Sequence, residues 1–90
     1  MKTISITIKG RVQGVFFRES TREKADGWGI TGQVMNLDNG DVKVVATGSQ
    51  AQLDKLVDWC RLGPPRAQVT GIEVKELPFE EFKRFKVHRL

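Results

Sequence analysis

The order of apolar and polar residues predicts β-strands at several places along the chain. Between residues 3 and 9, isoleucine alternates with polar residues, and this period of two is typical of a strand that buries one face. Two further apolar runs, residues 32–37 and 41–47, flank the tripeptide Asp38-Asn39-Gly40. An Asn-Gly pair between two such runs predicts a hairpin with a type I′ turn, in which both residues have a positive φ.

Two segments between the predicted strands have the pattern of amphipathic helices. The first covers residues 19–28 and is expected to stop at Gly27 or Gly29. The second begins at Ser49, and Gln52 three residues later completes the spacing of a capping box. Its apolar stripe follows the spacing i, i+3, i+4, i+7 and consists of Leu53, Leu56, Val57 and Cys60. The Gly-Pro-Pro sequence at residues 63–65 ends this helix.

Residues 68–77 and 82–90 are two more strand-like segments, and Pro78 between them can divide one outer strand. Gly71 inside the first of them predicts a β-bulge. The resulting order, β-α-β-β-α-β, predicts a ferredoxin-like α+β sandwich formed as one domain by residues 1–90. We expect an antiparallel sheet with both helices on one face and the other face open to solvent.

Composition and charge narrow the possible partners and cofactors. With 39% apolar and 29% charged residues, the 90-residue chain has the composition of a globular protein. Its 15 Lys and Arg against 11 Asp and Glu give a net charge of +4, which favours an anionic partner, either nucleic acid or a small metabolite. One cysteine, Cys60, and one histidine, His88, exclude an internal disulfide and metal sites built from several Cys or His. We therefore expect no metal and no cofactor.

A glycine-containing loop at residues 10–18 joins the first strand to the first helix. Such a turn exposes backbone N–H groups beside a helix N-terminus, and these donors bind anions. Gly14 lets the backbone approach a phosphate closely, and the guanidinium of Arg18 can fold over the same anion. The alternative is an ordinary turn followed by a solvated arginine. The loop lacks the Gly-Lys-Ser/Thr ending of a P-loop, which disfavours a nucleoside triphosphate.

Asn36 is the second candidate for a role in chemistry. It alternates with Val34 along the second strand and should share its face. If that strand lies beside the first strand, the amide of Asn36 can reach the anion of the loop and orient a water molecule. The alternative is a strand-end asparagine that prepares the hairpin.

Two other patterns suggest nucleotides but lack the context that nucleotide binding needs. Residues 27–32 match G-x-G-x-x-G, yet they follow a helix and open a strand, the reverse of a dinucleotide-binding turn. The RNA-recognition fold has the same element order, but the third strand here has no aromatic residue. We expect Phe79, Phe82 and Phe85 in the core rather than on a base-stacking surface. A non-catalytic module for RNA or an anionic metabolite is the alternative to an enzyme.

Two stretches of the chain together resemble the signatures of the acylphosphatase family. They read Gly10-x-Val12-Gln13-Gly14-Val15-x-Phe17-Arg18 and Gly32-x-Val34-x-Asn36-x-x-x-Gly40-x-Val42, the latter closing at Gly48. The resemblance implies hydrolysis of acyl phosphates to a carboxylate and inorganic phosphate. It implies catalytic roles for Arg18 and Asn36, with the amide of Asn36 positioning the attacking water. It also implies a phosphate-binding loop formed by Gln13, Gly14, Val15, Phe16, Phe17 and Arg18.

Three residues depart from the usual signatures: Gln33 replaces an aromatic residue, Met35 a frequently basic one and Phe16 a small one. None of them removes a group that the chemistry needs, so we expect effects on rate and substrate preference only. The implied partner is a small acyl phosphate, without metal, cofactor or nucleic acid. We expect a stand-alone monomer rather than a segment of a larger carbamoyl-transfer protein. Because no apolar run approaches the roughly 18 residues of a membrane span, we expect no membrane partner. The single cysteine makes a reducing cytoplasm the expected location.

Overall fold

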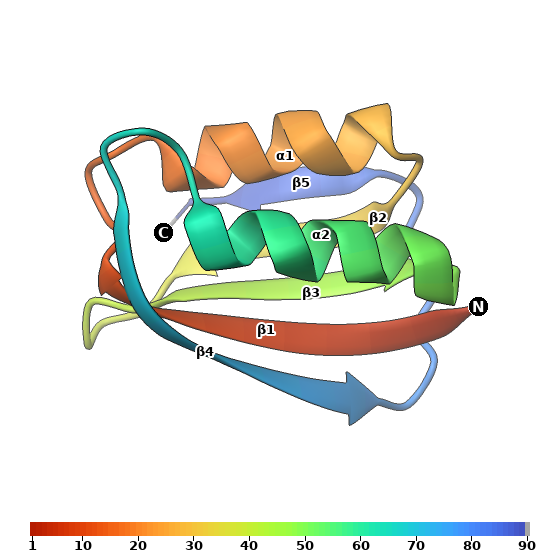
Figure 1. Ribbon diagram of the computed structural model, residues 1–90. Helices are drawn as coiled ribbons and strands as arrows, with labels where there is room; N and C mark the ends of the chain where they lie inside the picture. The colour runs from red at the N-terminus through yellow and green to blue at the C-terminus, as the bar shows by residue number, and fades with distance from the viewer. Residues whose placement is uncertain (90) are drawn as a thin grey trace.

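A single sheet with two helices on one of its faces is formed by residues 1–89, which are the residues that the computed structural model describes (Figure 1). The elements are β1 (Lys2–Arg11), α1 (Phe17–Gly27), β2 (Thr31–Asn36), β3 (Val42–Gly48), α2 (Gln50–Leu62), β4 (Gln68–Leu77) and β5 (Phe85–His88). The strands lie in the order β4-β1-β3-β2-β5. This arrangement confirms the ferredoxin-like α+β fold class.

The sheet is mixed rather than wholly antiparallel. The pairs β1–β3, β1–β4 and β2–β3 are antiparallel as expected, but β5 pairs parallel to β2. The chain reverses direction once between β4 and β5 while it passes from one edge of the sheet to the other, and this reversal brings β5 alongside β2 in the same direction. Pro78 therefore separates two strands at opposite edges instead of dividing one strand. The predicted last strand is shorter than expected, and its final residue, Leu90, lies outside the described residues.

The hairpin between β2 and β3 is confirmed, but its predicted turn type is wrong. The N–H of Leu37 donates to the Asp41 carbonyl at 2.8 Å, and the N–H of Gly40 donates to the Leu37 carbonyl at 3.1 Å. Three residues thus separate the paired ends, and in such a loop only the last residue needs a positive φ. Gly40 has a φ of 98°, but the φ of Asn39 is not positive, and a type I′ turn requires a positive φ at both residues.

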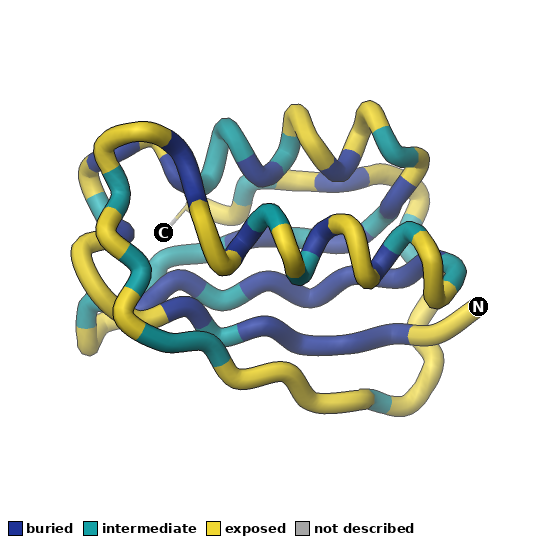
Figure 2. The backbone as a smooth tube through the Cα atoms, in the orientation of Figure 1, coloured by how far each residue is buried: buried dark blue, intermediate teal, exposed yellow. Residues whose placement is uncertain are grey.

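The core lies between the sheet and the helices, where the predicted apolar stripes meet. Figure 2 shows the buried residues along the central strands and on the sides of the helices that face them. Helix α2 begins with the expected capping box at Ser49 and buries Leu53, Leu56 and Cys60. Cys60 is fully buried and packs as a small apolar side chain, and this burial raises the pKa of its thiol to about 12. No helix within residues 1–89 is long and apolar enough to cross a membrane.

The sheet face opposite the helices is partly covered, contrary to the expectation of an open face. The segment between β4 and β5 crosses one end of it. There the hydroxyls of Thr3 and Thr47 lie 2.6 Å apart. The N–H of Glu80 donates to the Thr3 hydroxyl, and the Thr47 hydroxyl donates to the Glu80 carbonyl. Thr3 and Thr47 are buried beneath this segment.

Two smaller predictions concern the last third of the chain. The register between β1 and β4 shifts at Gly10, so that Thr70 is the additional residue, directly before Gly71. The predicted bulge is therefore confirmed beside that glycine. Among the three phenylalanines expected in the core, Phe85 is buried and Phe82 is half-buried. The prediction is wrong for Phe79, which is 59% exposed because the crossing segment runs over the surface.

Candidate anion-binding site

The loop between β1 and α1 presents a row of backbone donors. Helix α1 begins at Phe17, two residues earlier than the sequence pattern predicts. Gly14 and Phe16 have φ values of 74° and 65°, which turn the chain sharply before the helix. From residue 12 onward, the first backbone N–H that donates to a backbone carbonyl of the described residues is that of Ser20, which bonds the Phe16 carbonyl at 3.0 Å. The N–H groups before it are therefore available at a helix N-terminus, where they favour an anion.

Two of the predicted loop residues can serve an anion only through their backbone. The side chain of Val15 is buried, and that of Phe17 packs into the core with its ring centroid 5.5 Å from that of Trp59. These side chains anchor the loop to the domain interior. Phe16, by contrast, is 71% exposed and is the one residue other than glycine with a positive φ among residues 1–89.

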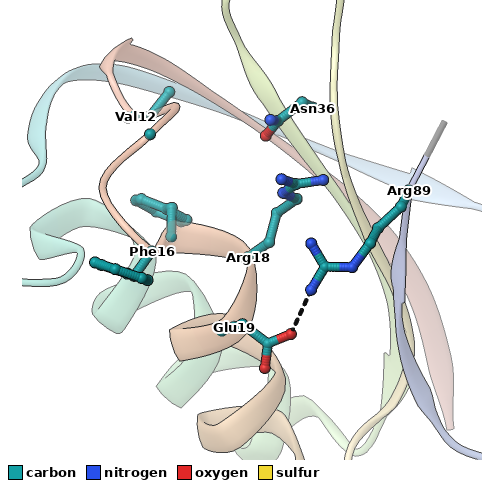
Figure 3. Close-up of a pocket in the computed structure, with 8 residues that line it drawn as sticks. Val12, Phe16, Arg18, Glu19, Asn36 and Arg89 are labelled. Carbon is teal, nitrogen blue, oxygen red and sulfur yellow. Dashed lines mark hydrogen bonds and ion pairs between the residues drawn. The ribbon is translucent and has the colours of Figure 1, made fainter.

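Arg18 and Asn36 line one depression of about 310 Å³, although they come from different elements. Arg18 lies in the first turn of α1, and Asn36 is the last residue of β2. Figure 3 shows the guanidinium of Arg18 extending toward the amide of Asn36. Asn36 shares the face of Val34 as predicted, but β2 does not lie beside β1, because β3 separates them. The proximity arises instead because α1 packs over β2 and β5.

Gln13 ties the loop to the hairpin through its side chain. Its Nε2 donates to the carbonyl of Leu37 at 2.8 Å and to the carbonyl of Asp41 at 2.9 Å. Asp41 is further held by Lys9, whose Nζ lies 3.0 Å from the carboxylate, and this hydrogen bond raises the pKa of Lys9. The segment that carries Arg18 is thereby connected to the segment that carries Asn36.

Sequence reasoning missed two residues of the site, the last residue of β5 and the residue that follows it. Arg89 lines the same depression as Arg18 and donates to Glu19 at 2.9 Å. His88 is exposed and lines a neighbouring depression with Arg18 and Asn36. Only the parallel pairing of β5 with β2 brings these residues to the site, and no local pattern in the sequence signals that pairing.

The charges around the depression suit an anion better than a cation. Arg18 and Arg89 contribute positive charge, and Glu19 is the one acidic residue that lines the same depression. Within residues 1–89, no group of three or more His, Cys, Asp or Glu is placed to hold a metal ion. The arrangement of backbone donors and a guanidinium is that of a site for phosphate or carboxylate.

The fold and this site define a small α+β domain with free backbone donors and a guanidinium where its first strand leads into its first helix. A family model described as "Acylphosphatase" matches residues 4–87. The acylphosphatase of Rubrobacter xylanophilus is 51% identical over 77 residues, which are 86% of this chain and 70% of that protein. The acylphosphatase of Methylococcus capsulatus is 47% identical over 90 residues, which are 99% of this chain and 98% of that protein.

Among solved structures, the acylphosphatase from Bacillus subtilis superimposes with a TM-score of 0.95 and 36% identity, covering 99% of this chain and 100% of that one. The chain belongs to the acylphosphatase family. This membership confirms the family that the two motifs suggested, and it favours an enzyme over the non-catalytic binding module.

Proposed function

We propose that this chain hydrolyses acyl phosphates and holds the phosphoryl group of the substrate between the loop of residues 13–18 and the side chains of Arg18 and Asn36. The observation that supports this most directly is that the loop, with its unpaired backbone N–H groups, reaches the same depression as both side chains. Family membership supports the reaction class.

The backbone N–H groups of the loop bind the phosphoryl oxygens, and Arg18 adds a charged pair of parallel donors. The side chain of Arg18 makes no hydrogen bond or ion pair to the described residues, so it can turn to the substrate without losing a partner. As negative charge develops on the oxygens in the transition state, these fixed donors stabilise it more than they stabilise the ground state.

The amide of Asn36 positions the attacking water against phosphorus. The oxygen of the water forms the new bond to phosphorus, and the bond between phosphorus and the acyl oxygen breaks. The carboxylate leaves with the electron pair, and a phosphoryl oxygen takes a proton from the water. A carboxylate is a weak base and a good leaving group, so the reaction needs no strong general base.

The decisive assay is hydrolysis of benzoyl phosphate in excess EDTA by the parent chain, by Arg18→Ala and by Asn36→Ala. We expect rapid turnover by the parent and a fall in kcat of roughly 100-fold or more in each variant, as for other fixed donors in a transition state. Arg18→Ala should also raise KM, because the arginine binds the ground state as well. Arg22→Ala is the matched control, since Arg22 lies one turn further along α1 and pairs with Glu19 and Asp26.

A specific kinetic result would contradict the role proposed for each residue. An unchanged kcat in Asn36→Ala would remove the water-positioning role. A change confined to KM in Arg18→Ala would remove its transition-state role. A folded parent without turnover would refute the hydrolase itself and return the anion-binding module as the better explanation.

We also propose that residues 1–90 act as one monomeric domain in the cytoplasm. Strand β1 pairs with β4 and strand β5 pairs with β2, so segments from the first and last parts of the chain belong to one sheet, which supports a single unit. The single cysteine, Cys60, is a free thiol, which suits a reducing compartment. Light scattering of the purified chain at several concentrations tests the monomer; a mass near 20 kDa, twice the 10.2 kDa of the chain, would contradict it.

A further inference from the structure

Arg89 places a second guanidinium in the depression that contains Arg18. It follows the last residue of β5, so it approaches from the sheet while Arg18 approaches from α1. Figure 3 shows the guanidinium of Arg89 turned toward Arg18 and joined to Glu19. The mechanism proposed above assigns a role to Arg18 and none to Arg89.

The carboxylate that Arg89 holds is shared and accessible. Glu19 also accepts hydrogen bonds from Arg22 at 3.1 and 3.3 Å, and Arg22 is bound to Asp26 as well. The side chains of Arg89 and Glu19 are 61% and 40% exposed. An ion pair this exposed is weak and exchanges easily, so another carboxylate can take the place of Glu19 on Arg89.

The two depressions of the site suggest on which side the acyl group of the substrate lies. Both depressions are lined by Arg18 and Asn36, so the phosphoryl group belongs at their junction. The attacking water and the leaving group stand on opposite sides of phosphorus. The depression with Asp38 and His88 is polar and suits the water, whereas the other is lined by Arg89 and leaves room for the acyl group.

We propose that Arg89 binds a terminal carboxylate on the acyl group, so that this enzyme favours acyl phosphates of short dicarboxylic acids over those with a neutral acyl group. The inference rests on the function proposed above. In the bound state, the substrate carboxylate replaces Glu19 as the partner of Arg89. Arg89 is then a specificity residue, and the reaction at phosphorus is unchanged.

The test compares kcat/KM for succinyl phosphate, which has a free carboxylate, with kcat/KM for acetyl phosphate, which has none. The ratio of the two cancels any effect on the phosphoryl group. We expect Arg89→Gln to lower this ratio about fivefold, the upper range for an exposed ion pair. Lys24→Gln is the control: it removes one positive charge from α1, but within the described residues Lys24 neither pairs with Glu19 nor lines the depression, so the ratio should not change.

A second variant tests the exchange of partners. Glu19→Gln frees Arg89 and should raise the ratio, and the double variant Glu19→Gln/Arg89→Gln should lose that gain. An equal change for both substrates in Arg89→Gln overturns the inference, because Arg89 then acts on the phosphoryl group alone. The inference is also overturned if the higher ratio seen in Glu19→Gln persists in the double variant. If the parent hydrolyses neither substrate, the proposed hydrolase itself fails, which is a different result from normal acetyl phosphate turnover with an unchanged ratio.

Discussion

The two hydrogen bonds that the Gln13 side chain donates to the hairpin should contribute both to the stability of the domain and to catalysis. Replacing Gln13 by methionine keeps the length of the side chain but removes both donated hydrogen bonds, to the carbonyls of Leu37 and Asp41. Arg18 lies on the loop side of this connection and Asn36 on the hairpin side. We therefore expect Gln13→Met to loosen the alignment of the two residues that the proposed mechanism needs together.

The expected loss in the free energy of unfolding depends on which hydrogen bonds the carbonyls of Leu37 and Asp41 still accept. A neutral hydrogen bond contributes about 0.5–1.5 kcal/mol net, so two of them contribute about 1–3 kcal/mol. The Leu37 carbonyl still accepts from Gly40 and the Asp41 carbonyl still accepts from Leu37, so neither is left without a partner. We therefore expect a loss in the lower part of that range, about 1–2 kcal/mol in the free energy of unfolding. With a denaturant slope of about 1 kcal/mol per M for a small domain, the urea midpoint falls by about 1–2 M.

Urea unfolding and the kinetics of benzoyl phosphate hydrolysis measure the two halves of the prediction. We expect kcat/KM to fall at least about tenfold under conditions where the variant is folded, since small misplacements of reacting groups are costly. Gln33→Met is the matched control, because Gln33 makes no side-chain hydrogen bond to the described residues and lines a different depression. Reduced stability with unchanged kcat/KM would refute the claim that the hydrogen bonds of Gln13 align Arg18 with Asn36. Unchanged stability and activity would show that the bonds contribute nothing.

Three further predictions test the fold. Gly32→Ala should destabilise the domain by at least about 3 kcal/mol in urea unfolding, because φ is 145° and a Cβ would lie against the Val45 carbonyl oxygen; Gly27→Ala, with open space around it, should lose nothing, and equal effects would contradict this account. Ser49→Ala removes the cap of α2 and should cost about 1 kcal/mol by the same measurement; no loss would show that the cap contributes nothing. Burial raises the pKa of Cys60 to about 12, so a thiol reagent at pH 9 should label the unfolded chain and spare the native one, and the stability from this thiol should fall as pH rises above 9; fast native labelling would contradict both.

Local features of the sequence were sufficient to predict the elements and part of the site. The alternation of Ile4, Ile6 and Ile8 and the capping box at Ser49 depend only on near neighbours, and both are confirmed. The turn before α1 was also predictable, because it depends on its own backbone and on Gly14. The turn type of the hairpin was not, since it depends on how many residues separate the paired ends of β2 and β3.

The tertiary structure decided which distant segments meet. The parallel pairing of β5 with β2, which brings Arg89 beside Arg18, joins residues about 50 positions apart in the chain, and no local period encodes it. The same holds for the bonds from Gln13 to the hairpin and for the cover that Glu80 forms over Thr3. Backbone period, caps and turns act over a few residues, so they determine elements and loops from the sequence alone. Sheet order and side-chain contacts between distant segments depend on packing the whole chain, and they bring Arg18 and Asn36 together.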